Sequence, residues 1–510
     1  MSRETRRAAR RTERTAVHLL QHPFRTLRNP WRPLEILAPE QIEAIHHASL
    51  HILENIGLDF MDDEALSLWQ AAGADVNHTT QRVRIDRGLL METIAHAPTQ
   101  FTWAARNPAH NVVLGGNHLT FGPPGGMVYV TDIERGRRQG TMADYEDLVR
   151  LCQMCPVLHY ATWEQVTPQD VPVNVRHLHR LMAGLTLSDK VVMESAHGRI
   201  IPEDALAMMR LVFGGELPAD PVIGDVINVN SPLRYDERML GGLISYARAG
   251  QVTFITPFIL AGAMSPVTMA AALAQQNAEA LAGVALTQLV RRGAPVVYGG
   301  FTTNVDMRSG APAFGTPEGA WAISAGAQLA RYYHLPYRAS GSLTNAQSAD
   351  AQSAYETMWN LWPVVMSHAN LIMHAAGWLE GGLTVSLEKF VIDVENLAMF
   401  AHFLEGFAVN EDTLALGSIA AVGPGGHHFG TDHTQAHYAT AFYQSSVANR
   451  QNYDSWAQAG REDAPQRAHK LWKTMLAQYE PPPLDPALRE SLTEFVAKRT
   501  QELEGIALYE

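Results

Sequence analysis

Eight short runs of β-branched, aromatic and small residues recur along the chain, and they alternate with longer segments whose apolar residues have helical spacing. The runs are residues 119–122, 159–165, 191–196, 222–229, 252–259, 295–301, 337–341 and 370–376. Strands that alternate with helices in this way form parallel βα units. No Gly-x-Gly-x-x-Gly phrase follows the first run, as a dinucleotide-binding open sheet would need. The alternation therefore predicts an α/β fold of the (β/α)8 TIM-barrel type.

The barrel is expected to occupy residues 119–408, with further segments on both sides of it. We predict a basic, flexible tail over residues 1–32, an N-terminal helical layer over residues 33–118, and a C-terminal helical extension over residues 409–510. The layer is expected to be helical because residues 39–57 and 63–72 are both amphipathic. Residues 127–141 are interpreted as a hairpin inserted after the first strand.

Charge is distributed unevenly along the chain. Residues 1–32 hold nine Arg and two Glu, a net +7 that leaves −20 for the rest of a chain whose formal charge is −13. This balance excludes a general nucleic-acid binder, which needs a basic face. The Arg-rich start is open to two interpretations. It is either a transit peptide or membrane-surface arm, or, as we prefer, a solvated tail that folds over its own acidic body.

The sequence also indicates a compartment. No window approaches the ~18 apolar residues that span a bilayer. The two cysteines, Cys152 and Cys155, are too few for a disulfide framework and fit a reducing compartment. They form a lone Cys-x-x-Cys at the end of a predicted helix, which we interpret as core residues rather than a zinc or redox pair. We expect a soluble, cytoplasmic protein.

The carboxyl ends of the strands carry the chemistry in a TIM barrel. The first strand ends in a phrase rich in glycine and proline, residues 121–127, where Gly122, Gly125 and Gly126 let the backbone approach a ligand closely. Ring faces and anions both attract a cation that cannot donate hydrogen bonds. The sequence therefore predicts an open barrel mouth suited to an alkylammonium ion. The candidate residues at the other strand ends are Trp163, Glu194, Phe301, Tyr337, Arg338, Asn345 and His374.

A second glycine-rich phrase, residues 423–430, leads into a group of histidines. His427, His433 and His437 could ligate a metal, because neutral imidazole is a common zinc ligand. Their spacing matches no known zinc pattern and no cysteine completes the set, so we prefer a structural or docking loop and assign no metal. The alternative is a metal-dependent barrel hydrolase or lyase that uses these three histidines.

Several phrases in order along the chain resemble the trimethylamine methyltransferase family. They are FGPPGGMVYVTD (121–132), SGSLTNAQSADAQSAYE (340–356), HAAGWLEGGLTVSLEKFVIDVE (374–395) and GPGGHHFGTDHTQAH (423–437), and residues 48–76 are also similar to the opening of that family. The resemblance covers residues 35–480. It implies a (β/α)8 methyltransferase that passes the methyl group of a methylated amine to the cobalt of a partner corrinoid (cobalamin) protein. It also implies a homo-oligomer with no tightly bound cofactor of its own.

The trimethylamine enzymes of this family carry pyrrolysine in the region matched by residues 343–349, where this sequence has only standard residues. The difference points to the non-pyrrolysine branch, whose members act on quaternary amines such as glycine betaine, proline betaine or carnitine. A quaternary nitrogen is already positive, so its methyl group needs only orientation, desolvation and a strong nucleophile. No general acid or base is obligatory, which agrees with the lack of a convincing catalytic triad.

This resemblance suggests roles for the residues at the mouth. The glycines of residues 122–127 and His374 are expected at the rim, with His374 and Glu194 as catalytic candidates and Glu194 as the electrostatic partner of the cation. The cage walls would be Trp163, Phe301 and Tyr337, and Arg338 or Asn345 would bind the carboxylate of a betaine. A betaine-binding protein without turnover is a third interpretation.

Overall fold

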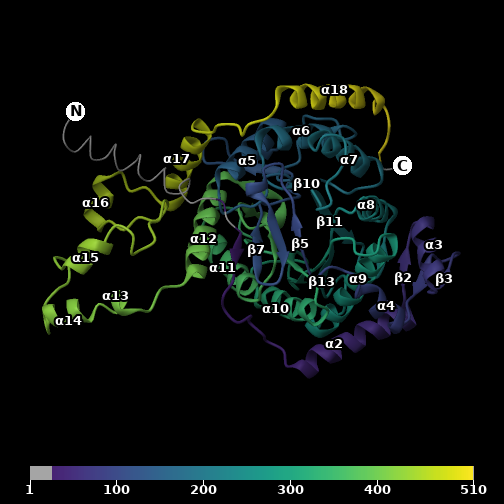
Figure 1. Ribbon diagram of the computed structural model, residues 1–510, viewed down its shortest axis with the longest axis horizontal. Coiled ribbons are helices and arrows are strands. Elements are labelled where there is room, and N and C mark those ends of the chain that lie inside the picture. Colours follow the sequence, from purple (N-terminus) through teal and green to yellow (C-terminus); the bar gives the residue numbers. More distant parts are fainter. Residues whose placement is uncertain (1–23, 25, 509–510) are drawn as a thin grey trace.

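The structure, a computed structural model, describes residue 24 and residues 26–508 (Figure 1). Most of the predicted basic tail, residues 1–23 and 25, lies outside the described residues. The end of that segment is not a free tail, because β1 (Leu27–Arg28) pairs antiparallel with β7 (His118–Phe121). No helix in the described part of the chain is long and apolar enough to cross a membrane.

Seven of the eight predicted runs form neighbouring parallel strands of one sheet, in the order β7-β18-β17-β14-β13-β11-β10. The strands other than β7 are β10 (Val192–Met193), β11 (Ile223–Val229), β13 (Val252–Ala261), β14 (Val296–Gly299), β17 (Tyr337–Ser340) and β18 (Leu371–Met373). Their residues are almost all buried, as expected for strands covered on both faces. The alternation in the sequence thus predicted these strands correctly.

The remaining run, residues 159–165, lies between β7 and β10, the two outer strands of this order, and is mostly irregular. The amide of His159 donates to the carbonyl of Phe121 in β7 over 2.8 Å, and Tyr160 forms an isolated parallel bridge with Val191, next to β10. The sheet is therefore curled, so that one short segment contacts both of its ends. The fold is a mixed α/β fold with a curled, mainly parallel sheet.

Helices follow the strands and surround the sheet (Figure 1). They are α5 (Met142–Met154), α6 (Arg176–Leu187), α7 (Ile200–Val212), α8 (Glu237–Arg248), α9 (Met269–Val290), α10 (Pro317–Tyr332), α11 (Ala351–Met366) and α12 (Leu387–Glu405). Local sequence determines where several begin: the side chains of Asp236, Thr316 and Asp350 accept hydrogen bonds from the first turns of α8, α10 and α11.

The N-terminal layer covers the outer face of α9, which is buried on nearly all sides. Its helices are α2 (Pro39–His51), α3 (Asp63–Ala72) and α4 (Arg87–Ile94). We expected a helical layer, and short strands accompany its helices. They are β2 (Leu58–Phe60), β3 (Asp75–Asn77) and β4 (Arg82–Arg84), which make a sheet with β12 (Arg234–Tyr235), and the hairpin of β5 (Gln100–Trp103) and β6 (Val112–Gly115). Runs of three or four residues are too short for their periodicity to predict strands.

Two smaller features complete the body. The predicted hairpin at residues 127–141 is present as β8 (Tyr129–Thr131) and β9 (Arg138–Gln139), and β8 also pairs with β20 (Thr384–Ser386), which follows β19 (Trp378–Leu379). After β14, the chain continues as β15 (Phe301–Val305), which pairs with β13 and with β16 (Pro312–Ala313). Both hairpins follow carboxyl ends of strands of the curled sheet.

The C-terminal region begins with a protrusion, residues 406–446, that carries α13 (Glu411–Leu414), α14 (Leu416–Val422) and α15 (Asp432–His437) away from the body (Figure 1). After α16 (Tyr453–Gln458), α17 (Ala464–Ala477) returns to pack on α12 and α5, and α18 (Pro486–Glu502) packs on α6 and α7. The predicted C-terminal extension is thus helical. Its division from the rest as a separate domain stays a prediction.

Candidate active site

Five rings gather where the strands end, and we call them the ring cluster: Trp163, Phe301, Phe314, His374 and Trp378. His374 is central, with its ring centroid 5.4 Å from Trp163, 5.6 Å from Phe301 and 4.7 Å from Trp378. Phe314 stacks on Phe301 at 5.7 Å and meets Trp378 edge-on at 5.6 Å. The carboxyl ends of several different strands thus contribute to one aromatic surface.

Unusual backbone conformations turn two of these rings toward the others. Trp163 has φ 105° and His374 has φ 52°, in the left-handed region that residues other than glycine rarely adopt. The amide of His374 donates to the carbonyl of Pro123, and its carbonyl accepts from the amide of Ser342. The surrounding loops therefore hold His374 in this strained conformation.

The glycines of the first loop make room for rings rather than leaving bare backbone for a ligand. An added Cβ at Gly125 would lie 1.9 Å from Cε3 of Trp163, and one at Gly122 would lie 1.9 Å from the ring of Tyr160. Gly126 is exposed and has φ 87°, so a side chain there would be strained although nothing lies within 4 Å. Gly122 and Gly125 thus position the aromatic side chains of residues 159–165, the segment that lies beside β7.

We predict that Gly125→Ala displaces Trp163 and lowers stability by about 1–3 kcal/mol, the usual cost of overpacking a filled site. Thermal unfolding and tryptophan fluorescence would measure both effects. Gly417→Ala is the matched control, because nothing lies within 4 Å of a Cβ at Gly417 in α14. Equal melting temperatures and spectra for the two variants would contradict this packing.

Arg338 lies at the base of the ring cluster and is 1% exposed. Its guanidinium donates to the sulfur of Met373 (3.0 Å), the carbonyl of Gly300 (3.3 Å) and Nε2 of His374 (3.3 Å), and it lies 5.4 Å from the centroid of Phe301. None of these groups is anionic, and no described Asp or Glu forms an ion pair with Arg338. Burial lowers the pKa of Arg338 to about 10, so the side chain is still charged at neutral pH. A buried cation without an anion is costly unless a ligand supplies the anion.

His374 adds a second unused donor. Because Nε2 accepts from Arg338, the ring proton of the neutral form belongs on Nδ1. Nδ1 is buried and has no hydrogen-bond partner among the described residues. Burial, followed by the charge of Arg338, holds the pKa of His374 well below its usual value, so the ring is neutral. Two of the five N–H groups of Arg338 are also left after its three hydrogen bonds.

Glu194 is fully buried and is not a free carboxylate. One oxygen accepts from Arg180 over 2.5 Å, and Arg180 also donates to Glu164 over 2.7 Å. Burial opposes the charge of Arg180, but the two carboxylates raise its pKa above the usual value. Two carboxylates around one guanidinium leave a net charge of −1. Glu194 therefore acts through this cluster rather than as a single counter-ion, and its other oxygen has no partner among the described residues.

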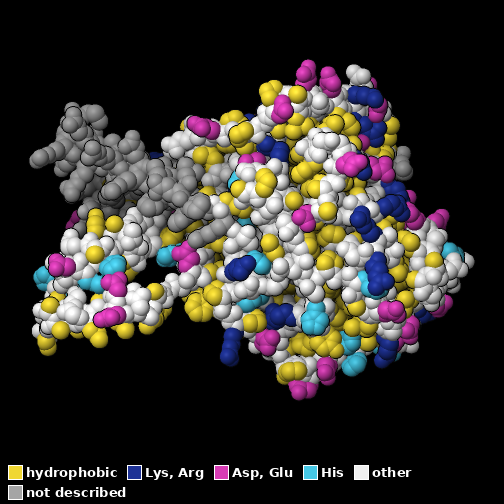
Figure 2. Space-filling model, viewed as in Figure 1, with side chains coloured by type: hydrophobic (Ala, Val, Ile, Leu, Met, Phe, Trp, Pro, Cys, Tyr) yellow, Lys and Arg dark blue, Asp and Glu magenta, His cyan; other side chains and the backbone are white. Residues whose placement is uncertain are grey.

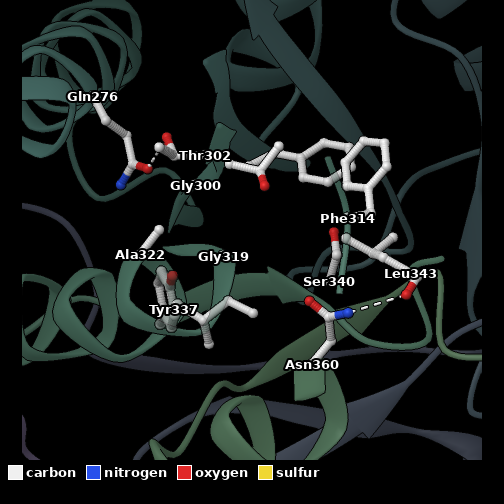
Figure 3. Close-up of a pocket in the computed structure, with 13 residues that line it drawn as sticks. Gln276, Gly300, Thr302, Phe314, Gly319, Ala322, Tyr337, Ser340, Leu343 and Asn360 are labelled. Atoms are coloured by element: carbon white, nitrogen blue, oxygen red, sulfur yellow. Dashed lines mark hydrogen bonds between the residues drawn. The ribbon is translucent and has the colours of Figure 1, made fainter. Parts of the chain in front are cut away.

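Two predicted residues have other contacts. The side-chain amide of Asn345 accepts from the amide of Phe314 and donates to the carbonyl of Pro312, so it anchors the β15–β16 hairpin and is not a free donor for a carboxylate. Tyr337 lies across a small cavity from Phe314 (Figure 3), and a Cβ at Gly326 of α10 would lie 2.5 Å from its hydroxyl. It is therefore not a member of the ring cluster. The two residue types suited the proposed roles, but the side-chain directions could not be known from the sequence.

The expected open mouth is filled by side chains. The cavity beside Phe301, drawn in Figure 3, holds about 20 Å³, the space of a single water molecule. On the outer side of Phe314 lies an open groove of about 630 Å³ that is lined by Asp306, Asn345, Glu356 and Glu380 among others. Phe314 lines both spaces. It separates an acidic groove from the other four rings of the cluster.

Comparison with known proteins places the chain in a family. Residues 3–504 match the family described as "Trimethylamine methyltransferase (MTTB)". The chain belongs to this family. It is 39% identical to a glycine betaine methyltransferase of Desulfitobacterium hafniense, covering 92% of this chain and 98% of that protein. It is 32% identical to a trimethylamine methyltransferase of the same species, over 92% of this chain and 94% of the relative. Of solved structures, the monomethylamine methyltransferase of Methanosarcina barkeri is similar with a TM-score of 0.46, 10% identity and coverage of 92% of this chain and 93% of that structure.

The chain is thus a methyltransferase, and the histidines of the alternative interpretation lie away from the body that holds the ring cluster (Figure 1). They lie on the protrusion, where His433 and His437 are close to Asp412 but His427 packs against Phe429 instead. His427 therefore does not join His433 and His437 in this group, as the alternative required. The glycines of residues 423–430 form a turn between α14 and α15, which sends His427 in another direction.

Sequence reasoning missed two residues of the candidate site, Arg180 and Phe314. Arg180 is one of two arginines in an amphipathic helix, where a cation normally indicates a solvated face, and only the fold brings it to Glu194. Phe314 lies in a hairpin outside the predicted strands. The one signal in the sequence is that helical spacing places Arg180 among the apolar residues of α6.

Proposed function

We propose that this methyltransferase takes a methyl group from a quaternary amine that also carries a carboxylate, of which glycine betaine is the simplest, and transfers it to the cobalt of a partner corrinoid protein. The observation that carries the proposal is the buried Arg338, a charged donor without a protein anion, beside a cluster of rings. A betaine presents the two complementary groups, an anion and a quaternary cation. The 39% identity to a glycine betaine methyltransferase supports the same substrate class.

The chain's own residues would bind and orient the substrate. Arg338 and Nδ1–H of His374 would donate to the carboxylate, while the faces of Phe301, Trp163 and Trp378 hold the methylated nitrogen in a site without water. When the partner is docked, its cobalt supplies the nucleophile that takes the methyl carbon, while the electron pair of the C–N bond stays on nitrogen and the amine leaves uncharged. Loss of the positive charge on nitrogen makes the product a weaker ligand of the rings than the substrate.

Entry of the substrate requires Phe314 to move. The cavity next to Phe301 is too small for a trimethylammonium group, whereas the groove outside it is large enough for a betaine. Asp306, Glu356 and Glu380 line that groove and would attract the cationic end. We therefore infer a route from the groove past Phe314 to the ring cluster.

We also infer that the curled sheet is a closed (β/α)8 barrel. The contacts of His159 with Phe121 and of Tyr160 with Val191 support an eighth, short strand between β7 and β10. A closed barrel would gather the strand ends around one mouth and so account for the convergence of the rings.

The proposed protein partners are the corrinoid protein and a second copy of the chain.

Betaine binding is expected to change little between about pH 6 and about pH 8 and to weaken as the pH rises through 10. His374 stays neutral over the lower range because its pKa is far below that of an exposed histidine. Arg338 has a pKa of about 10 in the free protein, so its positive charge is lost above that pH. Calorimetric titration with glycine betaine across this range would check the profile. A step in affinity near pH 6.5 would show that His374 titrates in the ordinary range.

The proposed activity is tested by incubating the protein with reduced cobalamin and, separately, glycine betaine, carnitine or trimethylamine. We expect methylcobalamin absorbance with a carboxylated quaternary amine and none with trimethylamine. The amine product, identified by mass spectrometry, should have lost one methyl group per methylcobalamin formed. Transfer from trimethylamine alone would contradict the proposal, and tight binding of betaine without transfer would favour the non-catalytic binding protein.

A further inference from the structure

The protrusion formed by residues 406–446, here called the arm, leaves large apolar side chains in solvent. None of its residues is buried. The side chains of Phe407, Phe429 and Phe442 are more than four-fifths exposed, and that of Tyr438 is 72% exposed. Figure 2 shows hydrophobic side chains along this part of the molecule. Monomeric soluble proteins rarely leave so many large apolar side chains uncovered in one segment.

The arm has little that would hold it in shape by itself. Its helices have four, seven and six residues, and isolated helices below about 12 residues are marginal in water. It contains no hydrophobic core of its own, since every side chain is at least partly exposed. A stable arm therefore needs a surface to lie on.

The body of the same chain has a matching surface on α10, α11 and α12, here called the aromatic face. It consists of the exposed side chains of Trp321, Tyr355, Trp359, Trp362 and Phe403, the last two with ring centroids 5.4 Å apart. No charged residue of α11 is exposed. The arm has only three charged residues besides its histidines, all acidic. Both surfaces are thus apolar, aromatic and nearly uncharged.

We propose that the arm of one copy covers the aromatic face of a second copy, and that the exchange is reciprocal. An exposed aromatic side chain contributes roughly 150–250 Å², so the four rings of the arm alone offer about 600 Å². A standard interface buries about 800 Å² on each partner, and the exposed aliphatic residues of the arm supply much of the difference. A reciprocal contact between two copies closes on itself and leaves neither surface free.

A second copy fits this surface better than a corrinoid protein that docks and leaves. A transient partner would leave the arm uncovered between turnovers, whereas an apolar interface of this size is typical of permanent oligomers. This proposal does not depend on the substrate of the enzyme. It remains testable if betaine proves to be the wrong amine.

The test is the mass of the full-length protein in solution, measured by analytical ultracentrifugation and light scattering. We expect an oligomer whose dissociation constant rises about 100-fold or more in Phe429→Asp/Phe442→Asp. Trp359→Asp, on the opposite side of the proposed contact, should have the same effect. The matched control is Val267→Asp, because Val267 is exposed on another part of the body. The arm variants should fold normally, since their substituted side chains are in solvent, and circular dichroism would confirm this.

Hydrogen exchange gives an independent measurement. In the wild-type protein, the amides of residues 406–446 should exchange more slowly as the protein concentration rises. In the Phe429→Asp/Phe442→Asp variant, they should exchange rapidly at every concentration. A monomeric wild-type protein would overturn the proposal. So would an oligomer that the arm variants leave intact, or protection of residues 406–446 that persists in a monomeric protein.

Discussion

Replacing Arg338 by Met is expected to reduce kcat/KM for glycine betaine by a factor of about 30 to several thousand, because removing one partner of a buried charge pair costs about 2–5 kcal/mol. The same substitution should leave the free energy of unfolding unchanged or higher. It removes a desolvated cation that has no protein anion in the free enzyme. Loss of activity with retained stability is the pattern of a ligand-binding charge, and a structural arginine would lose both.

Two measurements sharpen this result. Affinity for tetramethylammonium, which has no carboxylate, should be the same in Arg338→Met and wild type, so the variant loses its preference for betaine. Arg331→Met is the control, because Arg331 is a half-buried arginine of α10 whose guanidinium bonds the carbonyl of Ser367 and the carboxylate of Glu35. Betaine turnover within threefold of wild type in Arg338→Met would remove Arg338 from the site.

Replacing Arg180 by Met should have the largest effect on stability, a loss of about 3–5 kcal/mol, because it leaves Glu194 and Glu164 without their shared cation. Chemical denaturation would measure the change. The double variant Arg180→Met/Glu194→Gln should recover part of the loss, since only one carboxylate then remains. Arg248→Met, which removes an exposed ion pair with Glu64, should cost less than about 1 kcal/mol.

The effect of Arg180 should depend on pH. Burial raises the pKa of Glu164, but Arg180 outweighs it and the pKa lies below the usual value in the folded protein. Glu164 therefore contributes stability that is present above its unfolded pKa and is lost as the pH falls through the lower, folded value. The difference in stability between wild type and Arg180→Met should narrow at acid pH. A difference that does not change with pH would mean that the loss comes from packing alone.

The sequence predicted the sheet better than the site. Alternating apolar runs predict strands because burial on both faces imposes that composition, and seven of the eight runs form strands. Residues 159–165 do not form a regular strand, because the chain turns at Trp163. The backbone there is left-handed, and the sequence does not signal this as a glycine would. A positive φ at tryptophan arises from tertiary contacts, here the space above Gly125.

At the site, residue types were predicted more readily than their contacts. Phe301, Trp163 and His374 do gather, because Phe301 and His374 follow β14 and β18 and Trp163 follows the short segment between β7 and β10. Asn345 was a reasonable donor by type, but its amide bonds Phe314 and Pro312 of a hairpin that lies 31 and 33 positions away in the sequence. Arg180 meets Glu194 only after α6 packs on the sheet. Such pairings depend on side-chain direction, which periodicity does not determine.

The most direct test is a crystal structure of the protein with glycine betaine. We expect the carboxylate at hydrogen-bond distance from the guanidinium of Arg338 and Nδ1 of His374. The trimethylammonium group should contact the faces of Phe301 and Trp378, with Phe314 displaced toward the groove. Betaine bound in the groove with Arg338 still covered, or an unoccupied ring cluster at saturating ligand, would contradict the account.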